Sequence, residues 1–171
     1  MPTLVLDPPP PAFERLLEER RRAGADRRDE VWKGVLHMIP PPSVEHERLA
    51  HRLHVLLDLY ATAVELLVTG TVGIGEAEDY CVPDLALLRA GYSPQWNRTA
   101  ALVVEIVSPH DRTWEKVPFY AAHGVDELLI VDPSKRSLDW LALDNGEYRP
   151  IERSRVMTLS AGELAEAISW P

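Results

Sequence analysis

Ala101-Leu102-Val103-Val104-Glu105-Ile106-Val107 is a run of β-forming apolar residues that contains one carboxylate. A second run, Val82-Pro83-Asp84-Leu85-Ala86-Leu87-Leu88, contains another. Both runs predict strands in the interior of a sheet. A carboxylate among Val, Ile and Leu loses its hydration, and this cost is high unless a cation or a hydrogen-bond donor compensates it. The two acids therefore need a chemical reason to be there.

The strand pattern predicts where these carboxylates point. Glu105 shares a face with Val107, because side chains alternate along a strand. Pro83 removes a backbone donor just before Asp84, which favours a position where a strand begins. If the two strands are neighbours, the acids lie close enough to share an ion. Mg²⁺ and Mn²⁺ take one or two carboxylates from protein and leave the other positions to water and substrate phosphate.

The composition is that of one globular domain. The chain has 171 residues, of which 46% are hydrophobic and 26% charged, enough for a sizeable core. The amino terminus lacks a basic region followed by an apolar core, so we expect no secretion signal and a cytoplasmic location. A single cysteine, Cys81, cannot form an internal disulfide, and we interpret it as a small buried hydrophobe.

The charge limits how nucleic acid could be bound. The formal net charge is −9, and sequence-independent binding to a polyanion depends mainly on phosphate neutralisation by Lys and Arg. The first 28 residues hold six arginines against five acids, so the remaining chain is the more acidic part. Any contact with nucleic acid is therefore expected to be local.

The pattern along the chain predicts a mixed sheet flanked by helices, an α/β (α+β) fold. We expect a Pro-rich arm and peripheral helix over residues 1–28, and a single domain over 29–171. The expected elements are a helix over Phe13–Ala23, a hairpin over Asp29–Ile39 that turns at Lys33-Gly34, a long helix from an N-cap at Ser43 to about Ala63, strands at Val64–Val68, Val82–Leu88 and Ala100–Val107, a helix at Thr113–His123, strands at Glu127–Val131, Ser137–Leu143 and Tyr148–Glu152, and a helix from Ser160 to Ile168.

Several short motifs, taken in order, resemble a known family. These are Glu30-Val31-Trp32-Lys33-Gly34, then Pro-Pro-Ser with His46 in the following helix, Pro83-Asp84, Val104-Glu105-Ile106-Val107-Ser108-Pro109, Lys116, Tyr120, Gly124-Val125 and Val131-Asp132-Pro133. Their order and spacing over roughly residues 29–150 resemble the Uma-two family of putative restriction endonucleases. The resemblance implies a restriction-endonuclease-like fold of the PD-(D/E)XK superfamily and divalent-metal-dependent cleavage of nucleic acid, with DNA the expected substrate.

The resemblance also implies roles for particular residues. Asp84 and Glu105 match the two acids of the motif and would hold Mg²⁺ or Mn²⁺, and Glu30 matches a further acid, which we expect to be a third metal ligand. The chain departs from the motif at Val107, which stands where the lysine is usual, and Lys116 on the next helix is the natural substitute. His46 could hydrogen-bond Glu105 or a substrate phosphate. The resemblance further suggests a homodimer, which would suit a duplex.

Other interpretations of the same residues stay open. Asp84 and Glu105 could form an internal salt bridge with Lys116 or Arg112 and hold no ion. His46 could be a hydrogen-bonded core histidine. The chain could be a non-catalytic dimeric binding or regulatory module that keeps the nuclease fold, or it could hydrolyse a small phosphate ester.

Two patterns that suggest a zinc protease or a dinucleotide-binding protein do not match the motifs of those proteins. His46 and His51 are five residues apart, one more than the zinc-protease signature allows, and they point about 140° apart on a helix. Gly70, Gly73 and Gly75 have the wrong order for a dinucleotide-binding loop. We interpret these glycines as marks of a turn or bulge.

Overall fold

The computed structural model describes residues 11–109 and 112–170. The expected Pro-rich arm lies almost entirely outside the described residues. In chain order the elements are α1 Pro11–Ala23, β1 Glu30–Trp32, β2 Val35–His37, α2 Val44–Ala61, a 3-10 turn Thr62–Val64, β3 Leu67–Thr69, β4 Gly73–Glu76, β5 Asp79–Cys81, β6 Leu85–Leu88, β7 Trp96–Asn97, β8 Leu102–Ile106, a 3-10 turn Thr113–Lys116, α3 Val117–Ala122, β9 Glu127–Asp132, β10 Ser137–Asp144, β11 Glu147–Pro150 and α4 Ala161–Ala167.

A six-stranded sheet forms the centre of the molecule, in the order β11-β10-β9-β8-β6-β3. It is mixed, because β8 and β9 run parallel whereas β6 and β8 run antiparallel. The prediction of a central mixed sheet flanked by helices is confirmed. The expected neighbouring positions of the strands that carry the two acids are also confirmed.

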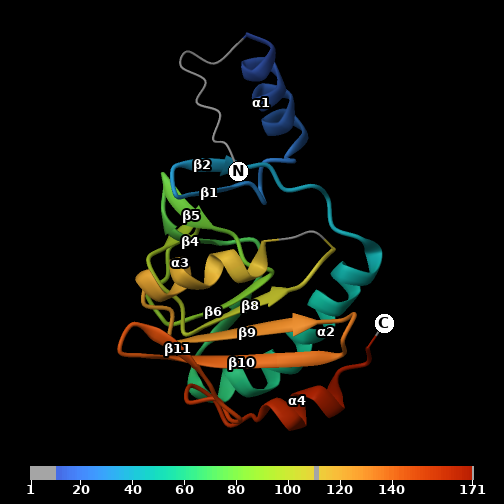
Figure 1. Ribbon diagram of the computed structural model, residues 1–171, viewed down its shortest axis with the longest axis vertical. Coiled ribbons are helices and arrows are strands. Elements are labelled where there is room, and N and C mark those ends of the chain that lie inside the picture. Colours follow the sequence, from blue (N-terminus) through green and yellow to red (C-terminus); the bar gives the residue numbers. More distant parts are fainter. Residues whose placement is uncertain (1–10, 110–111, 171) are drawn as a thin grey trace.

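The central sheet separates two hydrophobic clusters. On one face, leucines of α2 such as Leu53 and Leu57 pack with Val104 and Ile106 of β8 and with Leu164 of α4. On the other face, the second cluster joins residues of the central sheet to α3 and to the smaller sheet. Figure 1 shows α2 and α4 on one side of the central sheet and α3 on the other. Val104 and Ile106 of β8 thus face one cluster and Val103 faces the other, as expected from the alternation of side chains along a strand.

The residues that cap helices α2 and α4 are those that the sequence predicted. Ser43 is the N-cap of α2 and accepts a hydrogen bond from the backbone N–H of His46. Ser160 and Glu163 form a capping box at the start of α4, which satisfies two backbone donors at once. The helix α1 buries none of its residues and lies at one end of the molecule, beyond the β1–β2 hairpin (Figure 1). In the part of the chain that the structure describes, no helix is long and apolar enough to span a membrane.

A second sheet was not predicted. Its order is β2-β1-β5-β4-β7, so the β1–β2 hairpin belongs to a five-stranded layer rather than standing alone. The interpretation of Gly73 and Gly75 as a turn or bulge is wrong, because both lie in β4. A Cβ on Gly75 would be 2.2 Å from the carbonyl oxygen of Asp79, and its φ is +121°. Glycine is needed here because the two backbones approach closely.

One predicted strand is displaced along the chain. The strand expected at Val64–Val68 begins only at Leu67. The residues before it form a 3-10 turn, and Glu65 follows in the left-handed region with a φ of 56°. Helix α2 thus ends in a tight turn, which the sequence did not reveal because the apolar residues of Val64–Val68 are typical of a strand.

Candidate active site

A cavity of about 610 Å³ opens between the β1–β2 hairpin, the start of α2 and the 3-10 turn before α3. Every residue that the sequence analysis proposed for the site lines it: Glu30, His46, Asp84, Glu105 and Lys116. These residues come from five separate segments of the chain. The fold therefore brings the predicted site residues together, whatever their roles.

Asp84 and Glu105 face each other because their strands pair. Leu85 of β6 lies opposite Val104 of β8, and continuing this antiparallel register by one residue places Asp84 opposite Glu105. The Oδ2 atom of Asp84 accepts a hydrogen bond of 2.8 Å from the backbone N–H of Ile106. The prediction that Asp84 lies where a strand begins is confirmed, since β6 starts at the next residue.

His46 binds Asp84 rather than Glu105. Its Nε2 is 2.8 Å from Oδ1 of Asp84, and its Nδ1 is 3.1 Å from the hydroxyl oxygen of Ser108. The expectation that His46 hydrogen-bonds Glu105 is wrong, because the first turn of α2 places the ring at the Asp84 end of the carboxylate pair. Burial lowers the pKa of His46, but the hydrogen bond and the charge of Asp84 outweigh it and raise the pKa above its usual value.

Glu105 is more deeply buried than Asp84. Its side chain is 5% exposed against 12% for Asp84. Its Oε1 accepts hydrogen bonds from the hydroxyl of Tyr120 at 2.5 Å and from Nζ of Lys116 at 3.2 Å. Burial, with smaller contributions from Asp84 and Glu30, raises the pKa of Glu105 to about 7, although Lys116 acts in the opposite direction. Burial is therefore the main reason that Glu105 holds its proton more tightly than an exposed carboxyl group.

Lys116 reaches the site from the 3-10 turn that precedes α3. Its Nζ is 2.7 Å from Oε1 of Glu30 and contacts Glu105 as well. Burial alone would lower the pKa of Lys116, but the charges of Glu105 and Glu30 raise it above its usual value. The lysine therefore stays protonated. Its ammonium group lies beside Glu105, whereas position 107, where the motif that the sequence resembles has a lysine, holds valine.

Glu30 fits the role of lysine partner better than that of a metal ligand. Its Oε1 accepts from Lys116 and from the backbone N–H of Val82 at 2.9 Å, and its Oε2 accepts from Nε1 of Trp32 at 3.2 Å. Among the described residues, no group of three or more His, Cys, Asp or Glu is arranged to hold a metal ion. The expectation that Glu30 completes a three-acid set with Asp84 and Glu105 is thus not met by the arrangement of these side chains.

The remaining two acids fit a hard divalent cation. Asp84 and Glu105 lie opposite each other, line one cavity and supply carboxylate oxygens, which Mg²⁺ and Mn²⁺ prefer. A cation bound beside Glu105 would oppose the effect of burial, which raises the pKa of this acid. A centre with two carboxylates from protein leaves room for water and phosphate as the other ligands.

Three residues to which the sequence analysis gave no role contribute to the site. Tyr120 donates to Glu105, Ser108 contacts His46, and a guanidinium nitrogen of Arg28 lies 3.6 Å from Asp84. Tyr120 and Ser108 belong to the motifs that carry the family resemblance, and a contact of Tyr120 with the site could have been predicted because it follows Lys116 by four residues and so shares a helix face with it. No local pattern marks Arg28, which precedes β1 and reaches Asp84 only through the tertiary fold.

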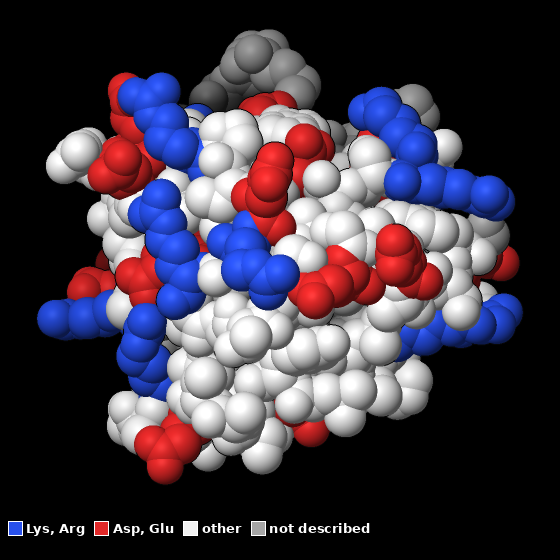
Figure 2. Space-filling view, turned by 90° about the horizontal axis from the view of Figure 1, so that it is seen from below, with Lys and Arg blue, Asp and Glu red and all other residues white. Residues whose placement is uncertain are grey.

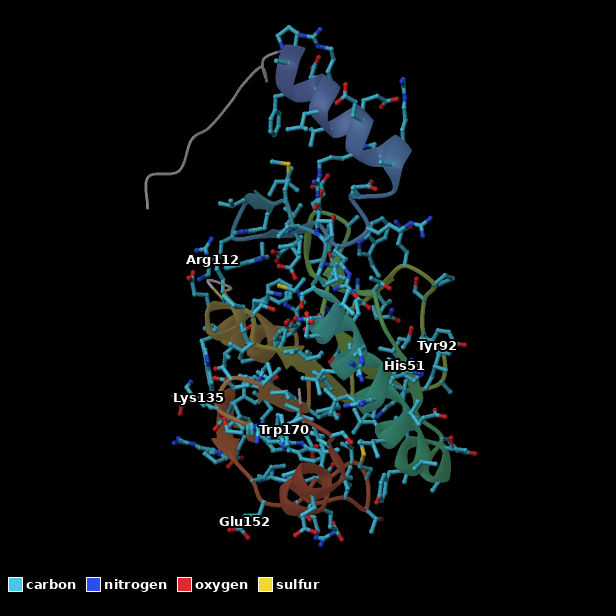
Figure 3. The ribbon with its side chains drawn as sticks, turned by 90° about the vertical axis from the view of Figure 1, so that its right-hand side faces the viewer. His51, Tyr92, Arg112, Lys135, Glu152 and Trp170 are labelled. Atoms are coloured by element: carbon cyan, nitrogen blue, oxygen red, sulfur yellow. The ribbon has the colours of Figure 1, made fainter. Side chains whose placement is uncertain are left out.

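An aromatic and basic stack forms one side of the cavity. The ring of His37 stacks on that of Trp32 with centroids 4.3 Å apart, and the guanidinium carbon of Arg112 lies 5.2 Å from the centroid of the Trp32 ring. Arg112 also pairs with Glu115. Figure 3 shows Arg112 at the edge of the molecule, below the hairpin and far from His51 and Tyr92. The pairing of Arg112 with Asp84 or Glu105 that we considered from the sequence is absent from the ion pairs of the described residues.

Two solved structures are similar to this chain. A putative nuclease of the DUF820 group from Anabaena variabilis ATCC 29413 superposes with a TM-score of 0.65 at 12% identity, covering 81% of this chain and 90% of that one. A chain of the DrdV–DNA complex, determined by cryo-EM, matches with a TM-score of 0.44 at 17% identity, covering 91% of this chain and 12% of that one. No curated protein matches the chain. The first likeness shows that the fold is shared with a solved structure.

A family model identifies the sequence over almost its full length. The Uma2 model, described as "Putative restriction endonuclease", matches residues 10–170. This range includes every residue that lines the cavity described above. The chain therefore belongs to the Uma2 family of putative restriction endonucleases.

Proposed function

We propose that the chain is a divalent-metal-dependent endonuclease that hydrolyses phosphodiester bonds of nucleic acid, with DNA as the expected substrate. The observation that carries the proposal is the meeting of Asp84 and Glu105, from paired strands, in one cavity with the ammonium group of Lys116 beside them. Membership of a family of putative restriction endonucleases supports the same reaction class.

Asp84 and Glu105 would hold Mg²⁺ or Mn²⁺. When bound, such an ion lowers the pKa of a water ligand and offsets the charge that develops on the phosphate. Neighbouring groups of the protein hold both carboxylates in fixed orientations by hydrogen bonds. The backbone N–H of Ile106 and the ring of His46 orient Asp84, and the hydroxyl of Tyr120 orients Glu105.

Lys116 would act as a fixed positive charge rather than as a general base. The charges of Glu105 and Glu30 raise its pKa, so its ammonium group keeps its proton at neutral pH. A charge held in a mostly buried position stabilises a developing oxyanion more strongly than one in water. Glu30 would then serve as a positioning residue, because it holds the ammonium group at 2.7 Å. A homodimer, which the family resemblance suggests, is part of this proposal.

One observation favours a second candidate, a non-catalytic binding or regulatory module that keeps the fold. Each of the two acids already has a positively charged neighbour, Lys116 beside Glu105 and Arg28 beside Asp84. In this alternative the ion pairs are structural, and the cavity binds a ligand without cleaving it. The two candidates differ in whether the acids bind a divalent cation.

The test combines metal binding with cleavage. Calorimetry with Mn²⁺ on the native chain, on Asp84→Asn and on Glu105→Gln should show binding that either substitution abolishes. A plasmid-nicking assay with Mn²⁺ should show activity that depends on both acids and falls with Lys116→Gln. Asp139→Asn, which removes an exposed acid outside the cavity, is the matched control. Unchanged metal binding in both site variants would refute the proposal, and metal binding without nicking would favour the second candidate.

A further inference from the structure

The acids of the candidate site lie below the surface of the protein. The side chains of Glu105 and Asp84 are 5% and 12% exposed, and that of Lys116 is 12% exposed. A phosphodiester group must therefore enter the cavity to reach them. The cavity volume, about 610 Å³, falls in the range of ~300–1,000 Å³ typical of sites that enclose one small ligand. A single nucleotide belongs to this size class, whereas a base-paired stack does not.

The wall of the cavity is suited to a nucleobase. Met38, Ile39 and Pro40, which follow β2, line one part of it, and Pro109 lines another. Met38 is 41% exposed, so part of its apolar side chain is available for contact. An apolar wall makes few favourable contacts with a duplex, because the outer surface of a duplex is phosphate and sugar. It can, however, cover the face of a base that is no longer stacked in a helix.

The stack on Trp32 offers a flat group at the same cavity. His37 and Arg112 both lie against the indole ring, so the indole itself is covered, being 2% exposed. The side chain of Arg112 is 38% exposed, although its Nε atom is buried, so part of the group that covers the indole can be reached from solvent. Guanidinium planes stack on unpaired bases in protein complexes with single strands. Arg112 is thus held in place before a ligand arrives.

The charge distribution also disfavours a long contact with a duplex. The net charge is −9, and on the face shown in Figure 2, which is the molecule of Figure 1 seen from below, lysines and arginines lie among acids and form no continuous basic surface. Tight binding along a duplex requires several phosphate contacts from Lys and Arg on one continuous surface. Contact with one or two nucleotides in a cavity does not require such a surface.

We propose that the cavity takes a single unpaired nucleotide, so that the substrate is nucleic acid in single-stranded or locally unpaired form, with Arg112 as the stacking platform. This inference rests on the proposed function for the cleavage step but concerns how the strand is presented. Enzymes that act on recessed nucleotides take them from single strands or out of the helix. The substrate class is therefore set by the depth of the acids and by the apolar wall.

The experiment measures binding and cleavage separately. Fluorescence anisotropy with Ca²⁺ compares a labelled DNA single strand, the same strand in a perfect duplex, and the same strand with an internal mismatched loop. We expect the single strand and the loop to bind at least about tenfold more tightly than the duplex, as one stacked base can supply. With Mn²⁺, cleavage should follow the same order. Equal or tighter binding of the perfect duplex would overturn the inference, even if the duplex is cut.

Two pairs of variants separate the cavity from general effects. Met38→Trp narrows the cavity, whereas Leu36→Trp on the same hairpin, at a similar exposure of 39%, changes a residue outside it. Arg112→Gln removes the platform, whereas Arg89→Gln removes an exposed arginine that also pairs with an acid, Asp126.

The first variant of each pair should weaken single-strand binding severalfold while the second does not. Equal effects within both pairs would contradict the assignment. Loss of cleavage with intact strand preference would count against the proposed function and not against this inference.

Discussion

Replacing Tyr120 with Phe should weaken metal binding at neutral pH and shift its pH dependence. The ring is fully buried, so Phe keeps the packing and removes only the hydroxyl that donates to Glu105. A hydrogen bond to an ionised group contributes about 1.5–3 kcal/mol. Because one pKa unit corresponds to about 1.4 kcal/mol, its loss should raise the pKa of Glu105 by about 1–2 units.

The consequence for the ion follows from competition with the proton. With a pKa of about 7, Glu105 is about half ionised at neutral pH in the native chain. After the shift, roughly 1–10% would be ionised at that pH. The apparent affinity for Mn²⁺ should then fall roughly 5- to 50-fold near neutral pH and recover when the pH is raised by about 1–2 units. In the native chain, affinity should rise with pH up to about 7 and then level off.

Calorimetric titration of Mn²⁺ from weakly acidic to weakly alkaline pH measures this shift. Tyr148→Phe is the matched control, because its hydroxyl donates to the backbone oxygen of Val125, away from the acids. A circular dichroism melt verifies that both variants fold. Superimposable pH profiles for the native chain and Tyr120→Phe would refute the role assigned to this hydroxyl, and so would a native affinity that is independent of pH in the acidic range.

Three further predictions concern stability. Glu127→Ala removes the buried acceptor of the Trp140 indole and of the Ser154 hydroxyl. Urea denaturation should show that the free energy of unfolding falls by about 3 kcal/mol or more, since each donor left without an acceptor costs about 1–3 kcal/mol. A fall below about 1 kcal/mol would contradict this. Gly75→Ala should lower the melting temperature strongly, because its Cβ meets backbone at 2.2 Å; an unchanged melt would show that β4 can shift. Ser160→Ala should cost about 1 kcal/mol through loss of the α4 cap, without changing Mn²⁺ affinity; an unchanged denaturation midpoint would contradict the capping role.

The sequence predicted the parts of the fold that have short-range causes. The β1–β2 hairpin turns at Lys33 and Gly34, both with positive φ as the residue pair suggested. Ser43 and Ser160 cap the helices expected to follow them. The start of β6 just after Asp84 follows from the preceding proline, because such a residue is tolerated at a strand end.

The second sheet escaped prediction because its strands are short and are stabilised by distant partners. The strand β4 contains two glycines and pairs with β5 and β7, so its residues read locally as a turn. Similarly, the partner of His46 depends on how α2 lies across the ends of β6 and β8. Lys116 was found only because a family pattern directed attention to it. Its contacts with Glu30 and Glu105 join residues 86 and 11 positions apart in sequence.

The ammonium group near Glu105 comes from the turn before α3, and position 107 is a valine. The acid and the lysine, which a linear motif places two residues apart, are thus 11 positions apart in this chain. An amino-acid pattern that demands acid and lysine two positions apart would pass over this chain. A geometric template of two opposed carboxylates with an ammonium group nearby would retrieve it. In this chain the candidate site is therefore defined by where the charged groups lie in space and not by their spacing along the sequence.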